Sequence, residues 1–334
     1  MWLLLLACTP EEPDFFLAWV EGEEGYQIAP RRIPELEEPL HMKGSLGQVT
    51  YGGHVPLTGT RYTGGQTLTV YYELDDGVAV PADVDGLMLY SFYANLADAR
   101  RWVEDHEQSL DEVFPLPMAW NPAASPLIEF SAADNAAYAV GNNFFVLLPD
   151  GKHRKVPLLA NRGVIAHELG HAVFHLLTAG GPFAPMLVED PSSVAGRWQA
   201  SLHEAFADVQ AALLTDDPAF ISVSLDMPAR DLSQEPVMTE AILPDNGSPL
   251  LYDPYPAGTV FASLLWELRE RTGDPDGTYA LLLRTAGAWR PATVNGASWM
   301  EALLAQADPD QRKILCEVAI LRLGDFWDSS GSCP

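Results

Sequence analysis

The stretch "GVIAHELGHAVFH", residues 163–175, decides the fold, because it sets three histidines and one glutamate into an otherwise apolar run. The polar side chains leave one face of a helix free to pack into a core. That apolar face consists of Val164, Ile165, Leu169, Val173 and Phe174. The stretch is either a buried helix that tolerates polar groups or a metal site built on a helix.

The spacing of His167 and His171 favours the metal site. Residues four apart on an α-helix are offset by about 40° and by about 6 Å along the axis. Two imidazole nitrogens can therefore reach one metal ion, and Glu168 points toward the adjacent open side of that ion. This H-E-x-x-H pattern supplies two ligands and a carboxylate that can take a proton from metal-bound water. We expect this chemistry rather than incidental histidines on a packing helix.

A catalytic zinc ion needs a third protein ligand and an open position for water. In the extended form of the pattern a glycine and a third histidine follow, but Phe174 and Leu177 occupy those positions here. His175 lies on nearly the same ridge as His171, yet it is two turns away from His167. Because it is too far away to share the ion, we expect His175 to have a structural role.

The segment "SLHEAFADV", residues 201–209, contains the next candidates within an amphipathic helix. Glu204 and Asp208 are four residues apart and share a face. One carboxylate could bind the metal while the other supports a ligating imidazole, which fixes the orientation of such a ligand. The alternative is a solvated acidic face, which we disfavour because Ala205 and Ala207 permit close packing.

Together, "VIAHELGHAV" (164–173) and "HEAFADVQAALL" (203–214) resemble the gluzincin metallopeptidases of the thermolysin and fungalysin type. The resemblance implies that Glu168 is the general base and that Asp208 supports a metal ligand. His203, beside Glu204, would contact a ligand or would itself be the third ligand. The implied zinc ligands are His167, His171 and Glu204.

The upstream segment "DNAAYAVGNNFFVLLPDG", residues 134–151, is similar to the edge strand that lies beside the substrate in that family. The resemblance implies that Asn135 and Ala136 hydrogen-bond a peptide backbone by strand addition. It extends loosely over residues 86–270. The stretch between the two ligand helices, which contains "GGPFAPMLVEDPSSVAGR", is longer than in thermolysin.

The main departure is that no histidine follows His203. The family uses a downstream histidine to stabilise the oxyanion, and in "YPAGTVFASLLWEL" (255–268) Tyr255 stands in its place. A phenol can donate a hydrogen bond to a developing oxyanion. Tyr252 and Arg230 are the other candidate donors, and a packing role for Tyr255 stays open.

These features predict a zinc-dependent endopeptidase that hydrolyses protein or peptide substrates through a zinc-bound water activated by Glu168. The alternative is a catalytically impaired zinc-binding surface lipoprotein with a binding or scaffolding role. A non-proteolytic H-E-x-x-H enzyme of the epoxide hydrolase kind is disfavoured, because it would need a longer multi-domain body. Acidic turns such as "TGDPDG" (272–277) permit a calcium ion, although such turns are more often merely solvated.

The net charge limits the kinds of partner that we expect, and the first residues indicate where the protein is located. The net charge of −27 repels phosphate backbones, which excludes nucleic acid as a partner. "MWLLLLAC" (1–8) resembles a lipoprotein signal that ends at a lipidated Cys8. We therefore expect export as a bacterial cell envelope lipoprotein or a secreted protein, with membrane contact only through the lipid. An oxidising compartment would allow Cys316 and Cys333 to bond. The oligomeric state is not indicated.

Strands followed by helices predict an α+β fold. The expected parts are a signal (1–8), a loosely ordered tether (9–43), a small β-rich unit (44–85) and a metallopeptidase domain (86–334) with a β lobe (86–156) and a helical lobe (157–334). Strands are expected in 66–74, 86–92, 114–120, 126–131 and 142–149. Helices are expected over 94–108, 159–178, 197–215, 257–272, 276–286, 297–306 and 309–323, and the long loops 179–196 and 216–255 are candidates for function.

Overall fold

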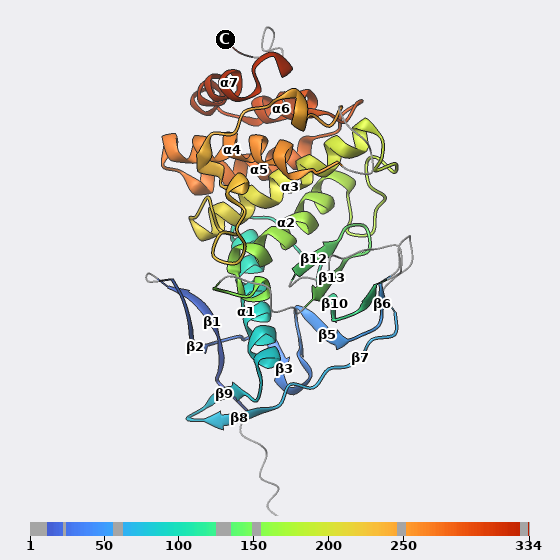
Figure 1. Ribbon diagram of the computed structural model, residues 1–334, viewed down its shortest axis with the longest axis vertical. Coiled ribbons are helices and arrows are strands. Elements are labelled where there is room, and N and C mark those ends of the chain that lie inside the picture. The colour runs from blue at the N-terminus through green and yellow to red at the C-terminus, as the bar shows by residue number, and fades with distance from the viewer. Residues whose placement is uncertain are drawn as a thin grey trace, which may run out of the picture.

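The computed structural model describes residues 12–22, 25–55, 63–124, 135–148, 155–245, 252–327 and 333. It confirms the α+β class. Strands and one long helix form one half of the molecule, and helices from residue 162 onward form the other (Figure 1). None of the described helices is both long and apolar enough to cross a membrane. Cys8 and the expected strand at 126–131 lie outside the described residues.

A four-stranded sheet near the N-terminus has the order β2-β1-β9-β8. Its inner strands are parallel to each other, and the two outer pairs are antiparallel. The tether predicted for 9–43 is therefore wrong over its ordered strands, because Phe16 and Ala18 are buried in the core while their neighbours Phe15, Leu17 and Trp19 stay at least partly exposed. The strands are β1 (Phe15–Gly22), β2 (Gly25–Arg31), β8 (Tyr72–Asp75) and β9 (Val78–Pro81).

A seven-stranded sheet has the order β12-β13-β10-β5-β4-β3, with β7 pairing β5. Its strands come both from the first 67 residues and from 116–148, so the predicted β unit at 44–85 shares its sheet with the following lobe. The strands are β3 (Leu36–Glu38), β4 (Lys43–Gly44), β5 (Gly47–Tyr51), β7 (Gln66–Thr67), β10 (Leu116–Trp120), β12 (Asn135–Ala139) and β13 (Phe144–Leu148). A separate pair joins β6 (His54–Val55) to β11 (Ala123–Ala124).

Helix α1 (Val84–Asp105) corrects the strand expected at 86–92. Leu89, Tyr90, Phe92 and Tyr93 are all buried, because both sides of this helix are covered. An apolar run buried on all sides lacks the helical period, and its aromatic residues mimic a strand. Asp83 sets the start of the helix, since its side chain accepts the N–H of Gly86.

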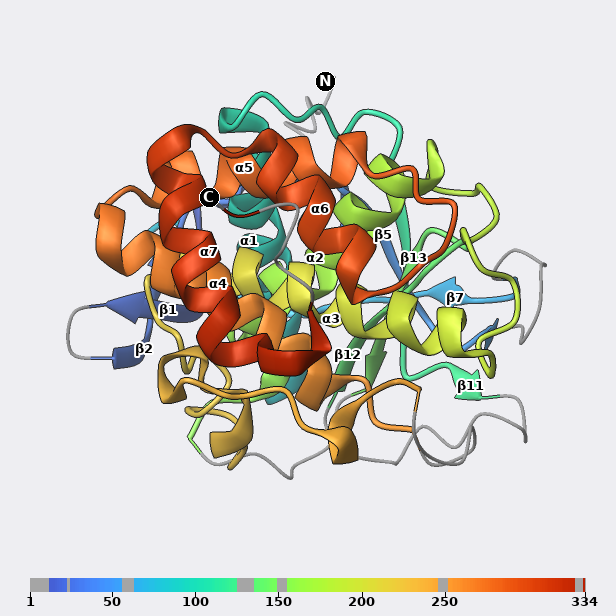
Figure 2. The same cartoon turned by 90° about the horizontal axis from the view of Figure 1, so that it is seen from above.

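The six helices expected after residue 157 are present, with ends within three residues of those predicted. They are α2 (Arg162–Ala179), α3 (Val194–Thr215), α4 (Tyr255–Thr272), α5 (Pro275–Ala288), α6 (Gly296–Gln306) and α7 (Pro309–Leu323). Helix α7 packs on α4 and α6 packs on α5 (Figure 2). Cys316 and Cys333, whose bonding the sequence leaves open, form a disulfide that ties the C-terminus to α7. In the acidic turn at 272–277, Asp274 caps α5.

Short 3-10 turns join these elements. Three of them lie in the long loop before α4, where the sequence predicts no regular structure. The turns are η1 (Pro39–His41), η2 (Leu158–Ala160), η3 (Pro228–Arg230), η4 (Leu232–Gln234), η5 (Glu240–Ile242) and η7 (Gly324–Phe326).

The glycine of the H-E-L-G-H stretch lies where α2 packs against α3. A Cβ on Gly170 would lie 2.8 Å from the Cα of Ala207 and 3.2 Å from its Cβ. Real Cβ atoms do not approach backbone atoms this closely, so α2 and α3 can hold this separation only with glycine at the contact. The contact lies one residue before His171 on α2 and one residue before Asp208 on α3.

Replacement of Gly170 by Ala is expected to lower the free energy of unfolding by about 1–3 kcal/mol, because the extra methyl group forces the two helices apart. Urea denaturation measures this change. Gly287→Ala is the matched control, since a Cβ there would meet only the tip of Leu177 at 3.9 Å. That variant should unfold at the same or a higher urea concentration, and equal destabilisation of both variants would contradict the account.

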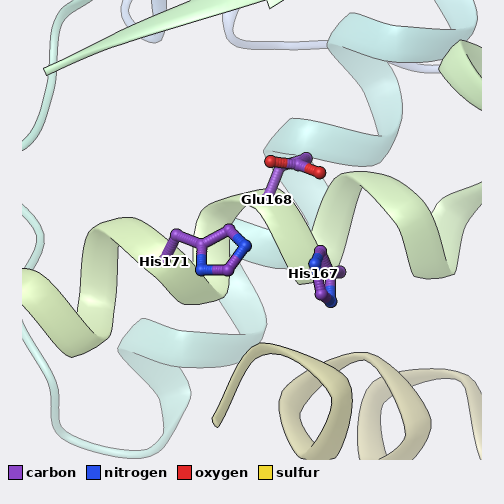
Figure 3. A group of neighbouring side chains, drawn as sticks. All are labelled: His167, Glu168 and His171. Atoms are coloured by element: carbon purple, nitrogen blue, oxygen red, sulfur yellow. The ribbon is translucent and has the colours of Figure 1, made fainter. Parts of the chain in front are cut away.

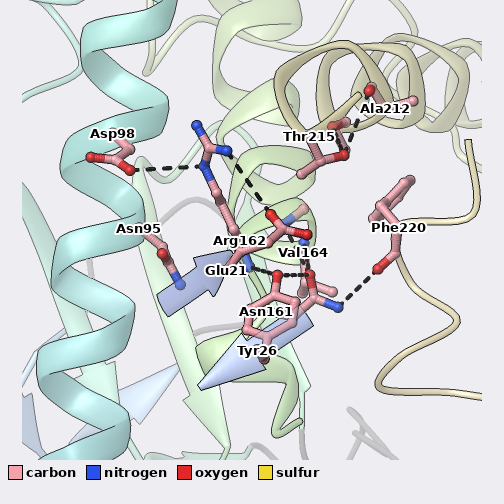
Figure 4. A network of polar contacts seen from close by, with 12 residues as sticks. Glu21, Tyr26, Asn95, Asp98, Asn161, Arg162, Val164, Ala212, Thr215 and Phe220 are labelled. Carbon is pink, nitrogen blue, oxygen red and sulfur yellow. Dashed lines mark hydrogen bonds and ion pairs between the residues drawn. The ribbon is translucent and has the colours of Figure 1, made fainter. Parts of the chain in front are cut away.

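The start of α2 is fixed by Asn161, which lies in a polar network between the first sheet and the helices (Figure 4). Its Oδ1 accepts the N–H groups of Gly163 at 2.9 Å and Val164 at 3.2 Å. Its Nδ2 donates to the carbonyl of Phe220 at 3.0 Å. The Tyr26 hydroxyl, from β2, donates to Asn161 Oδ1 at 3.3 Å and accepts the N–H of Arg162 at 2.9 Å. These contacts attach the first sheet to the helix that carries the histidines.

Replacement of Asn161 by Ala is expected to lower the free energy of unfolding by about 2–3 kcal/mol. About 1 kcal/mol is the cost of losing a helix cap, and the rest comes from leaving the buried carbonyl of Phe220 without its donor. Thermal or urea denaturation measures the loss. Asn295→Ala, which removes the half-buried cap of α6, is the control and should lose only about 1 kcal/mol. Losses of equal size would argue against the network.

Candidate metal centre

The two histidines of α2 and the glutamate between them form one compact group of metal-binding side chains (Figure 3). Each of His167, Glu168 and His171 offers one ligand atom, and these atoms lie within 4.8 Å of one another. All three residues are at most 9% exposed. Nitrogen and oxygen donors in a buried group of this kind fit a zinc ion.

Glu204 reaches the same point from α3. Its carboxylate oxygens lie 3.2 Å from Nε2 of His167 and 3.8 Å from Nε2 of His171. Two ligand atoms of a tetrahedral zinc ion, each at about 2.0–2.2 Å from it, lie about 3.3–3.6 Å apart. Oε2 of Glu204 is buried and has no hydrogen-bond partner among the described residues, although His167 is so close. The Glu204 carboxylate and the two imidazoles thus converge on a common point. Two nitrogen donors and one oxygen donor in this arrangement fit a zinc ion.

Asp208, one turn further along α3, fixes the orientation of His167. Its Oδ1 lies 2.8 Å from Nδ1 of His167, on the side of the ring opposite to Nε2. Asp208 is fully buried and also accepts a hydrogen bond from Arg230. Burial alone would raise the pKa of this carboxyl, but Arg230 and His167 outweigh burial and lower it to about 2. A carboxylate that stays ionised can hold the imidazole in one tautomer.

Arg230, which the sequence suggested as a candidate oxyanion donor, is a hydrogen-bond partner of Asp208. It lies in η3, is 5% exposed, and its Nη2 is 3.4 Å from Nδ1 of His167. One signal was available, because Arg230 is the only basic residue between α3 and α4. A lone cation in that loop is a natural partner for a buried carboxylate.

Burial and neighbouring charges shift the pKa values of the two histidines and of Glu168. Burial lowers the pKa of His171 to about 4, which leaves the ring neutral. Burial also lowers the pKa of His167, but the carboxylates of Asp208 and Glu204 outweigh it and raise the pKa to about 9. Burial raises the pKa of Glu168 to about 7, opposed by His167 and by the N–H of Tyr138. A carboxyl with a pKa near neutrality is suited to accept and return a proton.

A pocket of about 320 Å³ opens beside these groups. The N–H of Tyr138, on β12, donates to Oε2 of Glu168 at 2.8 Å, so this edge of the strand faces the site. Because backbone groups alternate along a strand, those of Ala136 face the same edge while those of Asn135 face β13. Nothing is described of the Asn135 side chain. The lining comprises Ala136, Ala137, Tyr138, Val140, Glu168, His171, Met186, Ala200, His203, Glu204 and Tyr255.

Of the three candidate oxyanion donors, Tyr255 lines this pocket, whereas Arg230 and Tyr252 do not. Tyr255 is the first residue of α4, and the guanidinium of Arg230 lies 4.3 Å from the centre of its ring. Burial raises the pKa of the Tyr255 phenol, so the hydroxyl keeps its proton and can donate it in a hydrogen bond. Tyr252 is hydrogen-bonded to Ser201 instead.

The other two histidines have different surroundings. Nε2 of His175 lies 3.0 Å from the carbonyl of Ala184, which agrees with the structural role expected for it. His203 is 4% exposed and lies with its ring centre 5.8 Å from that of His171. Neither nitrogen of His203 has a hydrogen-bond partner among the described residues. The contact expected between His203 and a metal-binding side chain is therefore not a hydrogen bond.

Comparison with known proteins finds a likeness at the level of the fold. No protein-family model matches the chain, and neither does any curated protein sequence. Among solved structures, the chain is similar to the precursor of protealysin, a metalloproteinase from Serratia proteamaculans. The TM-score is 0.53 at 13% identity, over 82% of this chain and 86% of that chain. The resemblance to metallopeptidases thus extends from the two motifs to the overall architecture.

Proposed function

We propose that this chain is a zinc-dependent endopeptidase. One observation carries the proposal. His167 and His171 of α2 and Glu204 of α3 converge on one point, and His171, Glu204, Glu168 and a strand edge line a pocket beside it. The likeness of the fold to a metalloproteinase precursor supports it. The proposed zinc ligands are these two histidines and Glu204, while Asp208 holds His167 in place.

When bound, zinc would supply Lewis-acid chemistry that activates a water molecule and polarises the scissile carbonyl. Glu168 would take the proton of that water and return it to the leaving amine. The N–H of Tyr138 orients the Glu168 carboxylate and keeps one of its oxygens engaged. The other oxygen is then left to exchange the proton.

The substrate would bind as an added strand along the outer edge of β12, which pairs only with β13 among the described strands. The backbone of Ala136 faces this edge and would hydrogen-bond the peptide, while a contact of the substrate with Asn135 stays a prediction. The Tyr255 hydroxyl would donate to the oxyanion. Arg230, stacked on the Tyr255 ring, would limit the movement of that ring.

The proposal is tested by incubating the zinc-loaded protein with casein and with a mixed peptide library, with and without a chelator. We expect internal peptide bonds to be cleaved, the cleavage to stop on chelation, and activity to return when zinc is added back. Product masses distinguish endopeptidase from exopeptidase cleavage. A protein that takes up one zinc ion but cleaves nothing would favour the alternative, a surface protein with a binding role.

Two further expectations stay predictions. Lipid attachment at Cys8, and with it a location in the cell envelope, falls on residues outside those described. Calcium binding is the other, and it is not part of the proposed reaction.

A further inference from the structure

The turn between β12 and β13 is short and contains two residues with a left-handed backbone. Ala139 pairs with Phe144, so residues 140–143 form the turn. Gly141 has a φ of 75° and Asn143 has a φ of 51°. Asparagine is one of the few residues other than glycine that adopt this region readily. The backbone alone would therefore accept glycine at position 143 as well, and the role of the asparagine side chain follows from its contacts.

The side chain of Asn143 is buried and uses both ends of its amide. The residue is 3% exposed. Its Oδ1 accepts the Tyr138 hydroxyl at 2.9 Å, and its Nδ2 donates to the carbonyl of Val113 at 2.9 Å. Val113 is itself buried, in the segment between α1 and β10. The amide thus connects strand β12 to the interior of the protein through the turn that follows the strand.

Tyr138 extends this connection to the reacting groups. Its N–H donates to Oε2 of Glu168 at 2.8 Å. Its ring packs edge-on against Phe145 of β13, with 5.6 Å between ring centres, and its hydroxyl donates to Asn143. One residue therefore links the proposed general base to a buried anchor. Because β12 pairs only with β13 among the described strands, the position of its outer edge depends on the side chains that anchor it.

Resting on the proposed endopeptidase function, we propose that Asn143 is a positioning residue for the reaction. Through the Tyr138 hydroxyl it holds β12 where the N–H of Tyr138 orients Glu168 and where the outer edge of the strand can take up a peptide. Neither Asn143 nor Val113 lines the pocket, so Asn143 acts through Tyr138 and not by touching the substrate.

The zinc ligands are independent of this connection. His167, His171 and Glu204 come from α2 and α3, and the hydrogen bonds of the Asn143 side chain go to Tyr138 and Val113. Loss of the Asn143 amide should therefore change peptide binding and turnover while the protein still takes up one zinc ion.

The test compares two substrates that share one scissile bond, a blocked octapeptide and a blocked dipeptide. Asn143→Gly removes the amide and keeps a residue that accepts the left-handed backbone. For the octapeptide, which pairs along the strand edge, KM is expected to rise about tenfold, since two hydrogen bonds that hold the strand are lost. For both substrates kcat should fall at least about tenfold, because Glu168 is less well oriented. The KM of the dipeptide, which contacts less of the edge, should change less.

Asn121→Gly is the matched control. Asn121 also has a left-handed backbone, with a φ of 49°, and it follows β10 of the same sheet, but it is exposed. That variant should keep the KM and kcat of the parent for both substrates.

Tyr138→Phe is the second variant, and it removes only the hydroxyl that Asn143 accepts. It should show the same rise in octapeptide KM, and the double variant Tyr138→Phe/Asn143→Gly should be little worse than Asn143→Gly alone, because both changes remove one contact. If Asn143→Gly does not fold, the KM values measured for Tyr138→Phe decide.

A merely structural role predicts a different result, because a partly unfolded sample loses kcat equally for both substrates and keeps its KM. That pattern would overturn the inference, and so would unchanged kinetics in both variants. The proposed function has its own readout, which is titration of the zinc-loaded Glu168→Gln protein with the octapeptide. If the parent hydrolyses nothing, only the peptidase is contradicted, and about tenfold weaker octapeptide binding on introducing Asn143→Gly still supports the role of Asn143. Equal binding would contradict that role.

Discussion

Glu168→Gln is expected to lower kcat/KM for peptide hydrolysis by about 10²–10⁴-fold, the contribution usual for a positioned general base. The amide can still accept the N–H of Tyr138, which is 2.8 Å from Oε2 of Glu168, so the side chain should keep its place. It cannot take a proton from water. Zinc content and the melting temperature should therefore stay close to those of the unaltered protein.

The measurement combines steady-state hydrolysis of a peptide with metal analysis of the same protein sample. Glu189→Gln is the control for the loss of one negative charge, because Glu189 is exposed in the loop between α2 and α3 and does not line the pocket. That variant should retain the activity of the parent. Full turnover in Glu168→Gln would rule out the assigned base.

Asp208→Asn is expected to have the largest combined effect on metal binding and stability. It removes the negative charge that pairs with both His167 and Arg230. Arg230 then remains as a buried charge without its partner, which typically costs about 3–5 kcal/mol. The loss of the carboxylate that orients a ligating histidine typically weakens metal binding by about 10–100-fold.

Denaturant titration of the metal-free protein and competition for zinc with a chelating dye measure these two effects separately. The double variant Asp208→Asn/Arg230→Met removes the unpaired charge as well, so it should recover much of the stability but not the zinc affinity. Such a result would show that the ion pair of Asp208 with Arg230 affects stability, while the contact of Asp208 with His167 affects zinc affinity. If Asp208→Asn left both quantities unchanged, the contacts with His167 and Arg230 would carry no energy.

Helices were predictable where one face is buried and the ends carry capping residues. In α7, Asp308 and Gln311 form a capping box and the helix ends before Gly324, and the prediction for 309–323 matches its bounds. In α1 the helix expected over 94–108 is present, but the first half was predicted as a strand, because the buried apolar run at 86–92 has no polar face to reveal its period. The strands β1 and β2 were missed since the Pro- and Glu-rich composition of residues 9–40 obscured the short apolar run that begins at Phe15.

The candidate site shows the same division between local and tertiary information. His167, Glu168 and His171 were found by spacing within one helix, and Glu204 by its spacing from Asp208 and by resemblance. The sequence shows Arg230 as the lone basic residue of its loop, but its pairing with Asp208, 22 residues away, depends on how that loop folds back on α3. That His203 has no hydrogen-bond partner among the described residues is likewise visible only in the folded structure.

The central claim is that α2 and α3 hold one zinc ion between His167, His171 and Glu204. The most direct test is a crystal structure of the zinc-loaded protein with anomalous diffraction recorded at both sides of the zinc absorption edge. The account predicts one strong zinc peak at about 2.0–2.2 Å from Nε2 of each histidine and from a carboxylate oxygen of Glu204. A zinc peak elsewhere, or none at this site in protein that has been loaded with zinc, would contradict it.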